Sequence, residues 1–151
     1  MTSPLNLVVE HQADDDKRDF ILKQVRQFND EQSNWHQAIR AEGGLPLDIY
    51  AVRDDQLIGG LISETVWGWL ALDYLWVAPD HRRNGLGSLL VMEAETLALE
   101  RQCQWVKVST FSFQAPDFYH KLGYETVGKL IDYPPGETMH WLRKNLASEL
   151  R

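Results

Sequence analysis

The sequence predicts a single mixed α/β domain, and three of its features support this fold class. Segments with strand character and segments with helical spacing follow one another in the order β-α-(α)-β-β-β-α-β-α-β-β. Residues 67–77 form one long apolar run, which is typical of a central strand. A glycine-bearing loop follows this run and opens directly into a helix. The length of 151 residues and the hydrophobic content of 44% fit one domain over residues 1–151.

The N-terminal part is expected to contribute one strand and one or two helices. Residues 5–11 are predicted to be a strand. Asp14 marks a helix start, because acidic residues are favourable near the positive end of a helix dipole. This helix is expected to end around residues 31–34, and residues 35–47 predict a helix fragment followed by a loop.

The middle of the chain is expected to form three successive strands. Residues 48–53 and 56–65 are two of them, separated by a turn at Asp54 and Asp55. The apolar run 67–77 is the third.

The C-terminal half predicts two helices and three strands. A helix over residues 86–101 carries an apolar stripe, and its charged residues Glu93, Glu95, Glu100 and Arg101 are expected to face solvent. The other expected elements are a strand at 104–111, a short helix at 117–122, and last strands at 124–128 and 138–144.

The loop before helix 86–101 has the composition of a diphosphate site. Glycines permit positive φ angles and allow a ligand to approach the backbone closely. The N-terminus of a helix adds unpaired N–H groups and the positive end of its dipole. Two arginines add charge and forked donors. The expected binding residues are Arg82, Arg83, Asn84, Gly85, Leu86, Gly87 and Ser88.

Composition excludes several other classes of protein. The formal net charge of −7 disfavours nucleic-acid binding and weakly favours small cationic ligands. Neither a signal peptide nor an apolar stretch of about 18 residues is found, so a cytoplasmic protein without a membrane partner is expected.

The histidines show no paired ligand spacing, so no metal is expected. The single cysteine, Cys103, is expected to be a small buried side chain. A dinucleotide-binding loop of the pattern G-x-G-x-x-G is not present, because Leu90 stands where the third glycine would follow Gly85 and Gly87.

Three segments together resemble the GNAT superfamily of acetyl-CoA-dependent N-acetyltransferases. Residues 82–87 resemble its pyrophosphate loop, R/Q-x-x-G-x-G/A. Residues 115–124 resemble its segment A-x-x-x-Y-x-x-x-G-F/Y. Residues 72–79 lie where the family's central strand carries a bulge that receives the cofactor. The run from 111 to 119 resembles a subgroup of small bacterial members.

The resemblance implies a fold, a co-substrate and a set of contacts. The fold is a central mixed, mostly antiparallel twisted sheet of about six to seven strands, flanked by about four helices. Acetyl-CoA is the implied co-substrate, without a metal, and its acetyl group would pass directly to a primary amine of a small molecule or peptide. Its pantetheine arm would pair with the backbone of Leu75, Trp76 and Val77. Ser112 stands where the family often has an asparagine that contacts the cofactor.

The resemblance also indicates catalytic candidates. Tyr119 is the candidate general acid for the leaving thiolate. A glutamate that some members use as the base would fall near Ala71, which cannot act as one, so Asp73 is the first candidate base, Glu64 the second and His120 a distant third. By strand alternation, Asp73 is expected to share a face with Ala71 and Leu75.

Three further expectations concern partners. Four tryptophans fall in or beside the regions that would frame the acceptor pocket, where they are expected either to pack in the core and interfaces or to form an aromatic wall for the acceptor: Trp35, Trp67, Trp69 and Trp76. A homodimer is expected through an edge formed by the late strands and Trp141. The alternative function is a sensor or interaction module that binds a CoA thioester without turnover.

Overall fold

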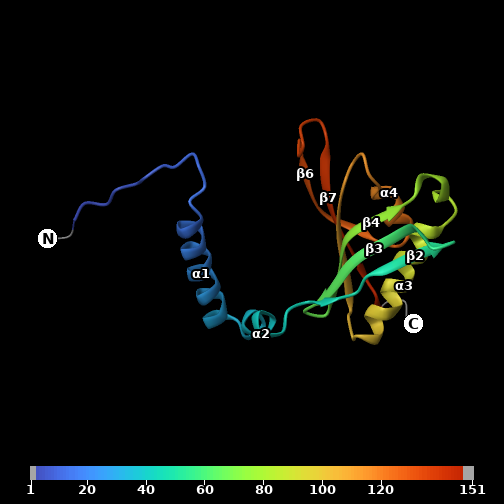
Figure 1. Ribbon diagram of the computed structural model, residues 1–151, viewed down its shortest axis with the longest axis horizontal. Helices are drawn as coiled ribbons and strands as arrows, with labels where there is room; N and C mark the ends of the chain where they lie inside the picture. The colour runs from blue at the N-terminus through green and yellow to red at the C-terminus, as the bar shows by residue number, and fades with distance from the viewer. Residues whose placement is uncertain (1–2, 148–151) are drawn as a thin grey trace. The chain divides into compact units, whose positions relative to one another are not determined.

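The structure, a computed structural model, describes residues 3–147, and the chain divides into two compact units with the boundary in the sequence between Glu42 and Gly43 (Figure 1). Unit 1 contains helices α1 (Asp15–Gln32) and α2 (Asn34–Glu42). Asp14 caps α1 as expected, because its carboxylate accepts a hydrogen bond of 3.0 Å from the Lys17 N–H.

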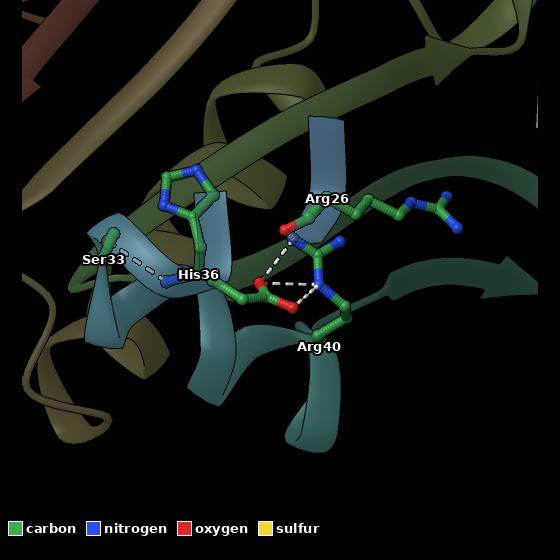
Figure 2. Close-up of polar contacts among 5 residues, drawn as sticks. Arg26, Ser33, His36 and Arg40 are labelled. Atoms are coloured by element: carbon green, nitrogen blue, oxygen red, sulfur yellow. Dashed lines mark hydrogen bonds and ion pairs between the residues drawn. The ribbon is translucent and has the colours of Figure 1, made fainter. Parts of the chain in front are cut away.

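The two helices of unit 1 are joined by Arg40 (Figure 2). Its guanidinium lies 2.8 Å from both carboxylate oxygens of Asp30 on α1 and donates to the carbonyl oxygen of Arg26 at 3.3 Å. The Ser33 hydroxyl accepts a hydrogen bond of 3.3 Å from the His36 N–H at the start of α2. The predicted strand at residues 5–11 is wrong, since this segment pairs with no described strand and has no regular structure.

The described part of unit 2, residues 43–147, contains one sheet, two α-helices and the 3₁₀ helix η1. Its elements are β1 (Leu45–Pro46), β2 (Ile49–Arg53), β3 (Gln56–Val66), β4 (Trp69–Val77), η1 (Pro79–His81), α3 (Leu86–Glu100), β5 (Trp105–Phe111), α4 (Pro116–Lys121), β6 (Glu125–Ile131) and β7 (Thr138–Asn145). The sheet has seven strands in the order β1-β3-β4-β5-β7-β6, with β2 also paired to β3. Only β4 and β5 are parallel, so the expected mixed, mostly antiparallel sheet is confirmed.

The core of unit 2 lies on one face of this sheet, which we call the helix face. Leu90, Val91 and Ala94 of α3 belong there to one buried hydrophobic cluster with Leu72 of β4 and Val108 of β5. Strand register places another set of side chains on the opposite face, which we call the open face: Trp69, Ala71, Lys107, Ser109, Trp141 and Arg143.

One buried polar cluster departs from the expected pattern. Glu95 of α3, expected to face solvent, is only 4% exposed. Its carboxylate accepts hydrogen bonds from the Tyr124 hydroxyl at 2.8 Å and from the Lys144 ammonium at 2.9 Å. A buried carboxylate requires such partners, because an unpaired charge in the core is very costly. Cys103 is buried as expected, and burial raises the pKa of its thiol.

Strand β4 carries a bulge at Asp73. Its neighbour β3 pairs Ile62 with Tyr74 and Ser63 with Leu72, so Asp73 has no partner. Because this extra residue interrupts the alternation, Ala71 lies on the open face and Leu75 packs toward the core. The expectation that Asp73 shares one face with both of them is therefore wrong.

The late strands form the long hairpin β6–β7 (Figure 1). Strand β7 lies between β5 and β6, so the edge of the sheet on this side is β6. The expectation that Trp141 lies at a sheet edge is wrong, because its strand is paired on both sides.

Candidate functional site

A cleft forms where β4 and β5 diverge. Their parallel pairing runs from Trp69 with Trp105 to Leu72 with Val108 and ends immediately before the bulge. Beyond this point β4 pairs only with β3, and its other edge faces a cavity of about 540 Å³. The lining of this cavity, here called the cleft, includes residues 72–77 of β4. The edge of Leu75 to Val77 can therefore pair with the amides of an extended ligand, as an added strand would.

The glycine loop borders a second cavity of about 540 Å³ next to the cleft. Arg83 has φ +64° and Gly85 has φ +81°, conformations that turn the loop back into α3. Gly85 caps α3 without any side-chain hydrogen bond, so the first N–H groups of the helix have no side-chain partner there. The loop residues that line the cavity are Arg82, Arg83, Gly85, Leu86, Gly87 and Ser88, while Asn84 is exposed beside them.

Besides Arg83, the cations Arg82 and Lys121 line this loop cavity in different ways. The Arg82 Nε donates a hydrogen bond of 2.9 Å to the Val77 carbonyl, which fixes the loop to the end of β4, and Arg82 lines both cavities. Lys121 of α4 also lines the loop cavity. Lys121 could not be predicted as a site residue from the sequence, because only the fold brings α4 beside the loop.

Gly87, at the start of α3, allows the Phe118 and Val77 side chains to pack close to the loop backbone. A Cβ atom at Gly87 would lie 3.4 Å from the Phe118 ring and 3.8 Å from the Val77 side chain. A larger side chain would therefore have to extend into the loop cavity.

Tyr119 lies on α4 and lines the cleft. The residue is 6% exposed, and its ring packs edge-on against Phe118 and Tyr124, with centroids 5.0 and 5.4 Å away. Burial raises the pKa of the Tyr119 phenol to about 12, so the hydroxyl keeps its proton at physiological pH. An acid in this position can donate a proton but does not serve as a base.

The two candidate bases occupy different positions. Asp73 is exposed at the bulge and lines the cleft. Glu64 is half-buried beside Gly44, where an added Cβ atom would lie 2.4 Å from its Oε2. Glu64 lies outside the linings described here, so Asp73 has the more direct access to the cleft.

A third cavity, of about 460 Å³, lies on the open face, and we call it the open-face cavity. Leu72, Asp73, Val108 and Ser109 line both it and the cleft, so the two share a wall at the point where β4 and β5 diverge. A second substrate in the open-face cavity would therefore meet the cleft beside Asp73.

The tryptophans fall in separate places. Trp69 lines the open-face cavity and stacks on Trp105 with ring centroids 5.4 Å apart, and Trp76 lines the cleft. Trp67 lies in the turn before β4, and Trp35 lies on α2 in unit 1. Trp141 also lines the open-face cavity, a position that could not be predicted from the sequence because only the pairing of β7 with β5 brings it there.

Ser112 has a local role. Its hydroxyl bonds to the Glu137 carboxylate and accepts a hydrogen bond of 3.0 Å from the Thr138 N–H. It lies outside the linings of the cleft and the loop cavity and ties the end of β5 to the start of β7.

Within residues 3–147, no group of three or more His, Cys, Asp or Glu side chains has a geometry that could hold a metal ion. No helix in that range is long and apolar enough to cross a membrane.

Comparison with known proteins finds similarity to acetyltransferases in both sequence and structure. The family model described as "Acetyltransferase (GNAT) family" matches residues 9–124. The chain is 40% identical over 133 residues to a blasticidin-S acetyltransferase of Streptomyces morookaense, covering 83% of this chain and 98% of that protein. A crystal structure of an acetyltransferase from Bacillus cereus is 27% identical, with a TM-score of 0.77 and coverage of 91% of this chain and 97% of that one. An aminoglycoside 6'-N-acetyltransferase complexed with coenzyme A shares the fold at 21% identity and a TM-score of 0.60, over 67% of this chain and 73% of that chain.

Proposed function

This chain belongs to the acetyltransferase (GNAT) family and is an acetyltransferase, and we propose that it moves the acetyl group of acetyl-CoA directly to a primary amine. The observation that carries the proposal is the pair of adjacent cavities: a free strand edge and Tyr119 line the cleft, the glycine loop lines the loop cavity, and Leu75, Val77 and Arg82 line both. We further propose that residues 1–151 act as one functional domain, because the family match at residues 9–124 spans both units.

The residues present fit acetyl-CoA. The unpaired N–H groups at the start of α3, with Arg82, Arg83 and Lys121, are suited to a diphosphate. The free edge of residues 75–77 is suited to the amides of the pantetheine arm. When bound, acetyl-CoA supplies a thioester whose acyl group is reactive toward an amine.

The chain's own groups then have distinct tasks. We propose that the Asp73 carboxylate accepts a proton from the acceptor's ammonium group, directly or through a water, because a neutral amine is needed for attack. The Ala78 N–H donates a hydrogen bond to the Ile58 carbonyl oxygen of β3. The alternate residues Leu75 and Val77 therefore point their backbone groups away from β3 toward the cleft, and their N–H groups are suited to polarise a carbonyl oxygen. The Tyr119 hydroxyl, protonated because of its raised pKa, donates toward the departing sulfur. Glu64 is the second candidate base.

We propose a small-molecule amine as the acceptor, and blasticidin S is the first compound to test because of the 40% identity to its acetyltransferase. The net charge of −7 favours an acceptor with a cationic group. We also propose that the protein forms a homodimer, which light scattering tests by measuring its mass in solution. No nucleic-acid or membrane partner is part of the proposal.

The proposal is tested by thiol release from acetyl-CoA with a panel of amines that includes blasticidin S. Mass spectrometry of the product should show an added acetyl group on nitrogen. Activity only with alcohols or thiols would contradict the proposed reaction.

A further inference from the structure

A row of charged residues crosses the open face of the sheet. Strand register pairs Glu64 with Ala71, Ala71 with Lys107, Lys107 with Arg143, and Arg143 with Glu125. Neighbouring strands are about 4.8 Å apart. Two cations therefore face each other directly across β5 and β7, an arrangement that is unfavourable in a sheet unless negative charge compensates it.

The two cations differ in what compensates them. The Arg143 Nε lies 2.8 Å from a Glu125 carboxylate oxygen, and its guanidinium lies 4.6 Å from the centre of the Trp105 ring. Lys107 is exposed, and among residues 3–147 its ammonium forms no hydrogen bond or ion pair. Arg143 is thus compensated by Glu125 and Trp105, whereas Lys107 is available to a ligand.

Lys107 lines the open-face cavity together with Asp73. Its strand partner Ala71 precedes Asp73 by two residues, a separation of roughly 7 Å along a strand. A molecule that presents its amine to Asp73 can therefore place another group at Lys107. Trp69 and Trp141 line the same cavity and offer apolar ring surface between polar ends.

We propose that Lys107 binds a carboxylate of the acceptor, so that the enzyme's acceptors are amines that also carry a carboxylate. This inference rests on the proposed function, since it assumes that the acceptor amine lies beside Asp73. It also locates the two charges of such an acceptor: the ammonium group near Asp73 and the carboxylate at Lys107. The overall charge of the protein then attracts the first group, and one local cation selects the second.

The test uses matched pairs of amines that differ only in carboxylate versus carboxamide. The series runs from glycine and glycinamide to 6-aminohexanoate and its amide, with 4-(aminomethyl)benzoate, its amide and its phosphonate analogue. Wild-type enzyme should prefer the carboxylates by roughly tenfold or more in kcat/KM, as expected for a hydrogen bond to a charged group. Binding of each pair is also measured by calorimetry in the presence of CoA, without turnover.

The variants are Lys107→Gln and Lys107→Arg, with Lys129→Gln as the matched control. Lys129 is an exposed lysine on β6 outside the cavities. Lys107→Gln should raise KM for the best carboxylate about tenfold, leave kcat within threefold, and leave KM for its amide unchanged. Lys107→Arg should restore most of the affinity, and Lys129→Gln should behave as wild type.

Several results would overturn the inference. These are equal use of acids and amides, preference for the phosphonate, equal loss on both members of a pair in Lys107→Gln, or activity confined to amines without an acidic group. If the wild-type enzyme acetylates no amine at all from acetyl-CoA, the proposed function itself fails. The two failures are therefore distinguishable.

Discussion

Replacing Tyr119 with phenylalanine removes only the hydroxyl of a residue that lines the cleft. The ring and its edge-on contacts with Phe118 and Tyr124 are retained. No described residue accepts a hydrogen bond from this hydroxyl, so its removal should change the free energy of unfolding by less than about 1 kcal/mol. Any large loss of activity in Tyr119→Phe would then come from chemistry.

The size of that loss follows from the environment of the phenol. With a pKa of about 12, Tyr119 is a weaker proton donor than an ordinary tyrosine at 10.0. Positioned acids contribute roughly 100- to 10,000-fold, so we expect the lower end, roughly 100-fold in kcat. The dissociation constant of acetyl-CoA should change by less than threefold, because the hydroxyl acts as charge develops on sulfur.

The raised pKa also determines the pH dependence. The phenol of the unfolded chain ionises near pH 10, and that of the folded chain near pH 12. The folded state therefore keeps the contribution of the neutral phenol to stability below pH 10 and loses it between pH 10 and 12. Turnover should accordingly show no decline from Tyr119 below pH 10.

The assay is stopped-flow or steady-state turnover with an established acceptor, alongside calorimetry and a melting curve. Tyr124→Phe is the matched control, since it removes a neighbouring hydroxyl that bonds to buried Glu95 at 2.8 Å. That control should lose about 1–3 kcal/mol of stability and keep its kcat. A well-folded Tyr119→Phe with wild-type turnover, when chemistry limits the rate, would refute the role of Tyr119 as the acid.

The other predictions concern the loop, the base and the core. Gly87→Glu should weaken acetyl-CoA at least about tenfold in calorimetry, because it places bulk and negative charge in the loop cavity; unchanged affinity would contradict the site. Asp73→Asn should lower kcat by roughly 100-fold and leave acetyl-CoA affinity within threefold, and if Glu64→Gln is the damaging variant instead, the assignment of the base is reversed. Lys144→Met should lower the free energy of unfolding by about 3–5 kcal/mol in urea titration, because buried Glu95 loses its partner; a change below about 1 kcal/mol would refute that role for the pair.

Much of the fold could be predicted from local signals in the sequence. Strand β5 was found from the alternation of Val106 and Val108 with polar neighbours, and α3 from the glycine loop that precedes it. Residues 5–11 show why such signals can fail, because they have strand character but no partner strand. Strand formation depends on pairing, which a single segment cannot reveal.

The parts of the site that depend on pairing could not be predicted. Lys107 faces Arg143 only because β5 pairs with β7 in one register, which joins residues 36 positions apart in the sequence. Glu95 has the spacing of a surface residue, and only the placement of Lys144 opposite α3 explains its burial. The position of the bulge within residues 72–79 likewise follows from the pairing with β3.

The bulge at Asp73 adds a residue to β4 that the pairing with β3 does not use. Leu72 and Tyr74 already pair with adjacent residues of β3, and their side chains already lie on opposite faces. A strand without residue 73 would therefore be regular, with every remaining side chain on its present face. The same strand would lose the bend that a bulge introduces beside the end of the β4–β5 pairing, and with it the carboxylate at the shared wall of the two cavities. We therefore expect a protein without residue 73 to keep the pairing of β3 with β4 and to lose the carboxylate at the shared wall of the two cavities.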